Sequence, residues 1–192
     1  MAKRGPYAKG VERREQILDA ALRVIAELGY RGTSVSELAA AVGLSQTGVL
    51  HYFGSKEELF IAVLRRRDEV DYVALQDENP GLGFIEVVRR NASVPGLVEL
   101  FTHMAAEAAD PQHPAHPYML ERYRAGTEYL ATALRDMQKS GTLAPEIDAM
   151  STATSLFALA DGLQVQWLLD PTVDMAAHLE RYWNQLTGRR QT

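Results

Sequence analysis

The apolar positions of this chain recur at spacings of three and four residues, which is the period of an amphipathic α-helix. The clearest stripe runs from Ile17 to Leu28 and is followed by Gly29, a residue type that commonly ends helices. Further along, proline and glycine separate helical patterns, and no stretch shows the strict alternation expected of a β-strand. The pattern therefore predicts an all-α protein.

Two short helices are predicted on either side of a glycine turn. Ser34 and Glu37 form a capping box, which marks the start of the first of them. Gly43 ends that helix, and Ser45 is a favourable N-cap for the next one. Because neither helix is long enough to be stable alone, both must pack on the preceding helix. Three helices of this kind predict a helix-turn-helix domain, whose last helix enters the major groove of DNA.

The second short helix is predicted to carry short, polar side chains on its outer face. They lie near the helix N-terminus, from which side chains reach base edges, and Gln and Thr suit adenine edges and thymine methyl groups. A histidine here would otherwise be read as an ordinary surface residue. Lys56, in the first turn of the following helix, opposes that helix's dipole, which favours an external phosphate as its partner. The outward positions are Gln46, Thr47, Gly48 and His51.

A longer motif surrounds this turn. It consists of the runs Gly32-Thr33-Ser34-Val35, Glu37-Leu38-Ala39, Val42-Gly43-Leu44-Ser45 and His51-Tyr52-Phe53-x-Ser55-Lys56-Glu57-Glu58-Leu59. Over about residues 13–64 the chain thus resembles the N-terminal domain of the TetR family of bacterial transcriptional regulators. The resemblance implies that Thr33, Tyr52 and Lys56 contact phosphates and that the outward positions face bases. The expected DNA-binding residues are Thr33, Ser45, Gln46, Thr47, Gly48, His51, Tyr52 and Lys56.

Two neighbouring aromatic residues in this motif have an alternative interpretation. Tyr52 and Phe53 could both close the small core of the domain, as neighbours on a short helix often do. We expect Phe53 in the core and Tyr52 at a phosphate, because the tyrosine ring is amphipathic.

Charge is divided unevenly along the chain. The whole chain carries a net charge of −5, yet residues 1–56 hold eight basic and five acidic residues, so that the remainder carries −8. Positive charge in the head and negative charge in the body suit a protein that binds phosphates at one end only. We expect a basic arm at 1–10 that contacts DNA or stays a solvated tail, a DNA-binding domain at 11–56, and a helical regulatory and dimerisation domain at 57–192, with a connecting helix over about 55–77.

A later helix, predicted from Met150 to Leu169, is apolar on almost every side. One layer of neighbours in so small a chain cannot cover it, so a second copy is expected against it and against the final helix, Met175 to Leu186. The TetR resemblance implies the same homodimer, which would present two reading helices to a palindromic operator. The expected interface residues are Leu156, Leu163, Trp167, Leu179, Tyr182 and Leu186.

The resemblance also implies a pocket in the C-terminal body for a small-molecule effector, whose binding changes the spacing of the two heads. Candidate lining residues combine aromatic bulk with a few polar groups, as binding pockets do. Most such residues are plain core in proteins, and Gln164 could instead bridge the dimer interface. The candidates are Phe84, Phe101, His103, Met104, Tyr123, Gln164 and Trp167.

Other chemistry finds little support in the sequence. The chain has no cysteine, which excludes disulfides and thiolate metal sites, and it contains no Gly-x-Ser-x-Gly or His-Glu-x-x-His motif. Asp110, His113 and His116 lie among prolines in a predicted loop that would not fix metal-ligand geometry. We expect no catalytic residue, metal or cofactor. No signal peptide or membrane-spanning run is evident, which predicts a cytoplasmic protein and no membrane partner.

Three hypotheses follow from these patterns. The favoured one is a dimeric DNA-binding repressor that a small-molecule effector releases from a palindromic operator. The second is a DNA-binding regulator without a small-molecule ligand, either constitutive or switched by a protein, and it predicts a body with no enclosed cavity. The third is a small all-α enzyme or metal-binding protein, which predicts ionisable groups converging in a cleft.

Overall fold

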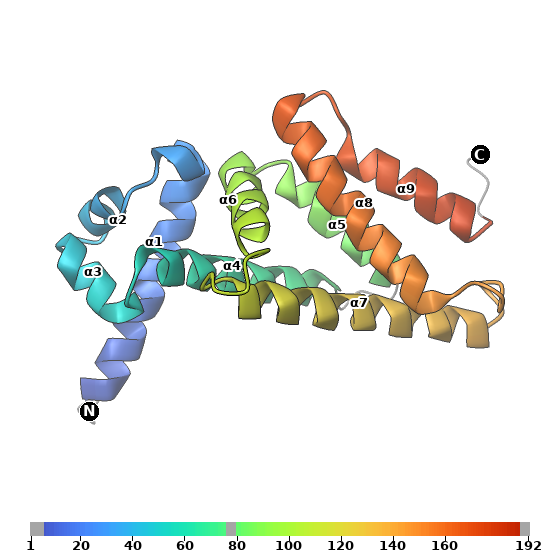
Figure 1. Ribbon diagram of the computed structural model, residues 1–192, viewed down its shortest axis with the longest axis horizontal. Coiled ribbons are helices and arrows are strands. Elements are labelled where there is room, and N and C mark those ends of the chain that lie inside the picture. Colours follow the sequence, from blue (N-terminus) through green and yellow to red (C-terminus); the bar gives the residue numbers. More distant parts are fainter. Residues whose placement is uncertain (1–5, 76–79, 189–192) are drawn as a thin grey trace.

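The computed structural model describes residues 6–75 and 80–188, and over these residues every regular element is an α-helix (Figure 1). The predicted all-α fold is confirmed. None of the helices within the described ranges is long and apolar enough to cross a membrane. In chain order the helices are α1 (Pro6–Gly32), α2 (Val35–Ala41), α3 (Gln46–Phe53), α4 (Lys56–Leu75), α5 (Pro80–Asn91), α6 (Pro95–Glu107), α7 (His116–Lys139), α8 (Ala149–Leu169) and α9 (Met175–Leu186).

The caps of α2 and α3 form as the sequence predicts. The Ser34 hydroxyl accepts a hydrogen bond from the Glu37 amide at 3.3 Å, and the Glu37 carboxylate accepts one from the Ser34 amide, which completes the capping box. The Ser45 hydroxyl accepts from the Gly48 amide at 3.0 Å. Gly43 between the two helices has a φ of 65°, a conformation that glycine adopts without a steric penalty.

Helix α1 is longer than the predicted stripe. It begins at Pro6, so Lys9 lies on a helix rather than in the expected arm, of which residues 1–5 lie outside the described part. Near its other end Gly29 has non-helical angles, φ 74° and ψ 169°, which interrupt the helix where the sequence places its stop. The Thr33 hydroxyl then donates to the Gly29 carbonyl oxygen at 2.7 Å. This bond closes the end of α1 and leads the chain into α2.

A first hydrophobic core joins the head to part of the body. It contains Ile17 and Ile25 of α1, Leu38 of α2 and Val49 of α3, all no more than 1% exposed. It also continues beyond residue 56, because Leu59 to Leu64 on α4 and Leu100, Phe101 and Met104 on α6 belong to the same cluster. The head therefore shares its core with two helices of the regulatory part.

Side chains of α5, α8, α9 and the second half of α7 form a second hydrophobic core. This core corrects the expected dimer interface. Leu156, Leu163, Trp167 and Leu179 are at most 8% exposed and pack inside the chain, and Tyr182 and Leu186 are half-buried against the same core. The reason is that α6, α7 and α9 all pack on α8 and satisfy most of its apolar surface within one chain.

The head and the regulatory part also meet along a close contact between α1 and α6. A Cβ atom at Gly96 would lie 2.1 Å from the Ile25 carbonyl oxygen, so only glycine allows the start of α6 to approach α1 this closely. Arg31 and Glu99 add an ion pair across the same contact, with Nε 3.0 Å from Oε1. The position of α6 is therefore set by backbone packing against α1.

We expect Gly96→Ala to lower the free energy of unfolding by about 1–3 kcal/mol, because the methyl group meets backbone rather than a flexible side chain. The matched control is Gly10→Ala on α1, where a Cβ meets no atom within 4 Å. That change should be neutral or stabilising by up to about 1 kcal/mol. Urea unfolding followed by circular dichroism measures both values. Equal stability of the two variants would contradict the close contact.

Candidate functional site: a DNA-reading helix and a pocket in the body

Helix α3 lies at the outer edge of the molecule, at the end remote from α8 and α9 (Figure 1). Gln46, Thr47 and His51 are exposed on it, whereas Val49 and Phe53 are buried in the first core. Four of the predicted base-facing positions thus fall on one short helix, with Gly48 half-buried between the others. An exposed polar face on a helix anchored by two apolar residues is the arrangement that a major groove accepts.

The residues expected at phosphates are placed less uniformly. Thr33 is only 3% exposed and its hydroxyl is engaged by Gly29, so in this structure it ends a helix and is not available to a phosphate. Tyr52 is half-buried against the first core, and its ring lies edge-on to His51 with the centroids 5.9 Å apart. Lys56 is exposed at the first residue of α4, with its Nζ 5.2 Å from the centre of the Phe60 ring.

Two arginines of α1 contact the other two helices of the head. Arg13 donates from Nη2 to the Val42 carbonyl oxygen at 2.6 Å and so caps the end of α2. The guanidinium of Arg14 lies 4.8 Å from the centre of the Phe53 ring. Sequence reasoning counted both charges in the basic head but did not place them beside the turn, because their position depends on how α1 packs on α2 and α3.

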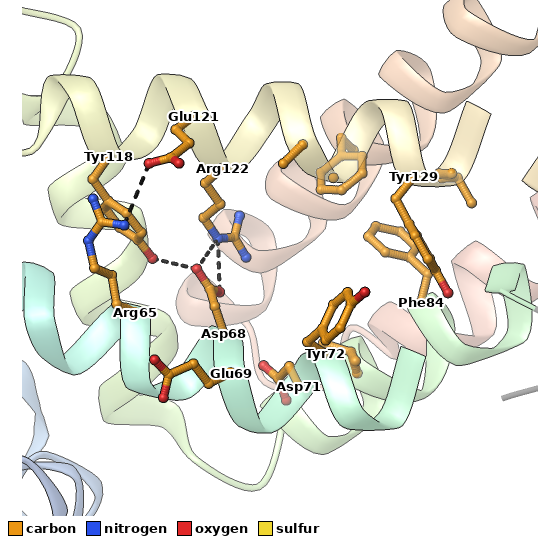
Figure 2. Close-up of a pocket in the computed structure, with 15 residues that line it drawn as sticks. Arg65, Asp68, Glu69, Asp71, Tyr72, Phe84, Tyr118, Glu121, Arg122 and Tyr129 are labelled. Carbon is orange, nitrogen blue, oxygen red and sulfur yellow. Dashed lines mark hydrogen bonds and ion pairs between the residues drawn. The ribbon is translucent and has the colours of Figure 1, made fainter. Parts of the chain in front are cut away.

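The second candidate site is a cavity of about 530 Å³ in the regulatory part (Figure 2). It is bounded by side chains of α4, α5, α7 and α8. Charged residues of α4 and α7 form one part of the wall and aromatic residues form another. The lining residues are Arg65, Asp68, Glu69, Asp71, Tyr72, Phe84, Val87, Tyr118, Glu121, Arg122, Ala125, Gly126, Tyr129, Leu130 and Phe157.

Of the seven residues expected in a pocket, Phe84 alone lines this cavity. Phe101 and Met104 are buried in the first core, and Trp167 is buried in the second. His103 is exposed beside Tyr30 and lies 3.1 Å from Glu107, away from the cavity. The remaining two form a separate polar contact: the Tyr123 hydroxyl donates to Asp161 at 2.7 Å, and Gln164 donates to the same carboxylate at 3.4 Å.

Asp68 is the centre of the charged wall. Its carboxylate accepts a hydrogen bond from the Tyr118 hydroxyl at 2.6 Å and two from Nε of Arg122, at 3.0 and 3.1 Å (Figure 2). Burial and the neighbouring carboxylate both raise the pKa of the Tyr118 hydroxyl, which stays protonated and able to donate. Burial alone would lower the pKa of Arg122, but Asp68, Tyr118 and Asp161 together more than offset this and the pKa is raised. The guanidinium is therefore charged.

Two other buried carboxylates lie near this wall. Asp71 has Arg67 Nε and Arg90 Nη2 each 3.6 Å from one of its oxygens. Burial raises the pKa of Asp71 even though both guanidinium groups act in the opposite direction. Burial likewise raises the pKa of Asp161, against the hydrogen bond from Tyr123 and the charge of Arg122.

The cavity brings several ionisable side chains together. Ionisable groups do converge in a cleft, as the third hypothesis requires, but no His, Ser, Thr, Cys or Lys is among the lining residues of this cavity. At the first residue of α7, His116 Nδ1 is hydrogen-bonded to the Ala108 carbonyl oxygen at 2.8 Å, and in the loop before α7 His113 Nδ1 accepts from the Ala115 amide at 3.2 Å. These histidines hold the loop, and the described residues contain no cluster suited to a metal ion.

Comparisons with known proteins match two separate parts of the chain. Residues 17–63 match the family model of bacterial regulatory proteins of the tetR family, and residues 89–188 match that of the C-terminal domain of BetI-type transcriptional repressors. A helix-turn-helix head on an all-α body thus defines a DNA-binding transcriptional regulator. The chain belongs to the TetR family, with a BetI-type C-terminal part.

Individual relatives are similar over different shares of the chain. The transcriptional repressor AcnR of Corynebacterium efficiens is 42% identical over 81 residues, which is 42% of this chain and 41% of AcnR. The transcriptional regulator PksA of Bacillus subtilis is 27% identical over 169 residues, covering 83% of this chain and 80% of PksA. A transcriptional regulator from Saccharomonospora viridis, solved in complex with choline, has a TM-score of 0.70 and 24% identity over 91% of this chain and 95% of its own.

We expect Tyr118→Phe to lower the free energy of unfolding by about 1–2 kcal/mol, because the buried Asp68 carboxylate loses one of its donors. Tyr72→Phe is the matched control, since Tyr72 is 53% exposed on the same cavity. That control should unfold within about 0.5 kcal/mol of wild type. Urea titration monitored by tryptophan fluorescence measures both changes. The hydrogen bond would be unimportant if the two variants were equally stable.

Proposed function

We propose that this regulator acts as a homodimer, grips a palindromic operator through α3 of each copy, and is a repressor released when a small molecule fills the cavity between α4, α5, α7 and α8. The observation that carries the proposal is an exposed polar α3 held at one end of a body that contains a cavity of about 530 Å³.

The proposed DNA contacts are revised by the burial of the side chains. Gln46, Thr47 and His51 are proposed to face bases, because they are the exposed polar side chains of α3. Lys56 is proposed to contact a phosphate, because it is exposed where the chain leaves α3. Thr33 is left out of the set because its hydroxyl already donates to a backbone carbonyl.

The proposed dimer uses the outer face of α8. Val165 and Leu169 are 50% and 83% exposed, and with Ala158 and Gly162 they recur at spacings of four, three and four residues. Small residues at the first two positions would allow a second α8 to approach closely. Both α8 and α9 lie far from α3, so a dimer formed there leaves the two reading helices free (Figure 1).

Effector response is proposed to pass through α4. This helix begins at Lys56 next to α3 and carries Asp68 and Tyr72 in the cavity wall. A rigid helix shared by both sites would convert a change at the cavity into a movement of the head. The crystal of the Saccharomonospora regulator with choline supports a small-molecule occupant for this fold.

Selection of bound sequences from random duplexes, followed by fluorescence anisotropy, tests the DNA-binding role. The double variant Thr47→Ala, His51→Ala should lose most of the preference for the selected operator over a scrambled duplex, by about 1–3 kcal/mol per lost base contact. Lys56→Gln is the comparison: it should weaken binding to both duplexes alike and reduce the salt slope by about one. Failure of the wild type to bind any duplex in a salt-dependent way would end the proposal.

A charge on the outer face of α8 tests the dimer. Val165→Asp should give monomers at micromolar concentration in sedimentation velocity, because it would place two unpaired carboxylates in the interface. Ala26→Asp, on an exposed position of α1, adds the same charge elsewhere and should leave the dimer intact. A Val165→Asp protein that sediments as the wild-type dimer would exclude this face.

A further inference from the structure

The cavity between α4, α5, α7 and α8 has two chemically different ends (Figure 2). Charged side chains gather around Asp68 and Arg122 at one end. At the other end lie the rings of Tyr72, Phe84 and Tyr129, and Phe84 also packs on Phe157 with the ring centroids 4.9 Å apart. A ligand that fills the cavity must therefore combine a polar group with an apolar body.

The carboxylates of the charged end already face arginines. Their charges are neutralised by groups of the chain itself, so their number in the wall does not translate into attraction for a cation. The pairs are Asp68–Arg122 at 3.0 Å, Glu69–Arg66 at 3.2 Å, Asp71–Arg67 at 3.6 Å and Glu121–Arg65 at 3.6 Å.

Two arginines in this region have nitrogens that make no hydrogen bond within the described part of the chain. Arg122 uses Nε for both oxygens of Asp68, and in the described part of the chain neither of its terminal nitrogens makes a hydrogen bond. Nε and Nη2 of Arg90 are likewise buried without a hydrogen-bond partner among these residues. Arg122 lines the cavity, whereas Arg90 does not, so the unused terminal nitrogens of Arg122 are the donors available to an acceptor placed there.

The free edge of Arg122 is turned into the cavity. Its guanidinium stacks on Phe101 at 4.5 Å, which covers one face of the group. Figure 2 shows its terminal nitrogens on the side turned away from Asp68. This edge presents two parallel N–H groups, the geometry that matches the two oxygens of a carboxylate.

We propose that the cavity binds an amphipathic organic anion, with its carboxylate on the free edge of Arg122 and its apolar body among Tyr72, Phe84 and Tyr129. The inference rests on the proposed function, in which this cavity is the effector site, and it names the chemical class of that effector. A quaternary ammonium ligand would also stack on the aromatic rings, but it would find no unpaired carboxylate and would lie close to Arg122.

The same contact links ligand binding at the cavity to the position of the head. Asp68 lies on α4 twelve residues after Lys56, which is about 18 Å along the helix. A ligand carboxylate on the free edge of Arg122 shares the positive charge of that guanidinium with Asp68, and the two carboxylates repel each other. Binding therefore weakens the attachment of the helix that leads to α3.

Three probes of one shape test the inference by isothermal titration calorimetry on the full chain: 4-biphenylcarboxylate, 4-biphenylmethanol and (4-biphenylmethyl)trimethylammonium. The carboxylate should bind at least about ten-fold more tightly than the other two, the effect of one charge-assisted bidentate contact. Arg122→Gln should remove this preference. Arg124→Gln, an exposed neighbour on α7 outside the cavity, should retain it.

The comparison among probes on the wild-type protein needs no variant, so it decides the matter even if Arg122→Gln fails to fold. Equal binding of the three probes, tighter binding of the ammonium compound, or binding of none would overturn the inference. Anisotropy with the selected operator separates this result from the proposed function. If the carboxylate is preferred and the operator affinity does not change, the ligand chemistry stands and the effector role fails.

Discussion

The contact between Asp68 and Arg122 ties together the two helices on which the rest of the structure depends. Two half-buried charges are costly unless they are paired and hydrogen-bonded, and here the carboxylate receives donors from both Arg122 and Tyr118. The pair joins α4 to α7 at the cavity. Because α4 starts at Lys56, directly after α3, the same pair holds the far end of the helix that supports the DNA-reading head.

The packing explains how a head and a body can act as one unit. The first hydrophobic core continues from α1, α2 and α3 into α4 and α6, and Gly96 lets α6 meet the backbone of α1. The second core closes α8 and α9 onto α5 and α7. The cavity lies where α4, α5, α7 and α8 meet, so that an occupant touches helices of both cores. The proposed effector response depends on this continuity.

Local signals predicted the head well, and longer-range packing decided what they missed. The caps at Ser34 and Ser45 and the turn at Gly43 depend on neighbouring residues only, and all three formed. The cavity depends on which face of α4 meets α7: Asp68 looks like one more charge on a solvated helix until Tyr118, fifty residues later, covers it. The sequence did not separate the inner face of α8 from its outer face, because an all-round apolar pattern does not show that Leu156 points into the chain's own core.

The most direct test of this account is the distance between the two heads of a dimer. The chain has no cysteine, so the variant Ser36→Cys, at an exposed position of α2, carries one spin label per copy. Double electron–electron resonance then measures the distance between the two labels of a dimer. The account predicts one distance with operator DNA bound and a different one, by several ångström, with 4-biphenylcarboxylate bound. Identical distance distributions in the two states would contradict the proposed link between cavity and reading helix.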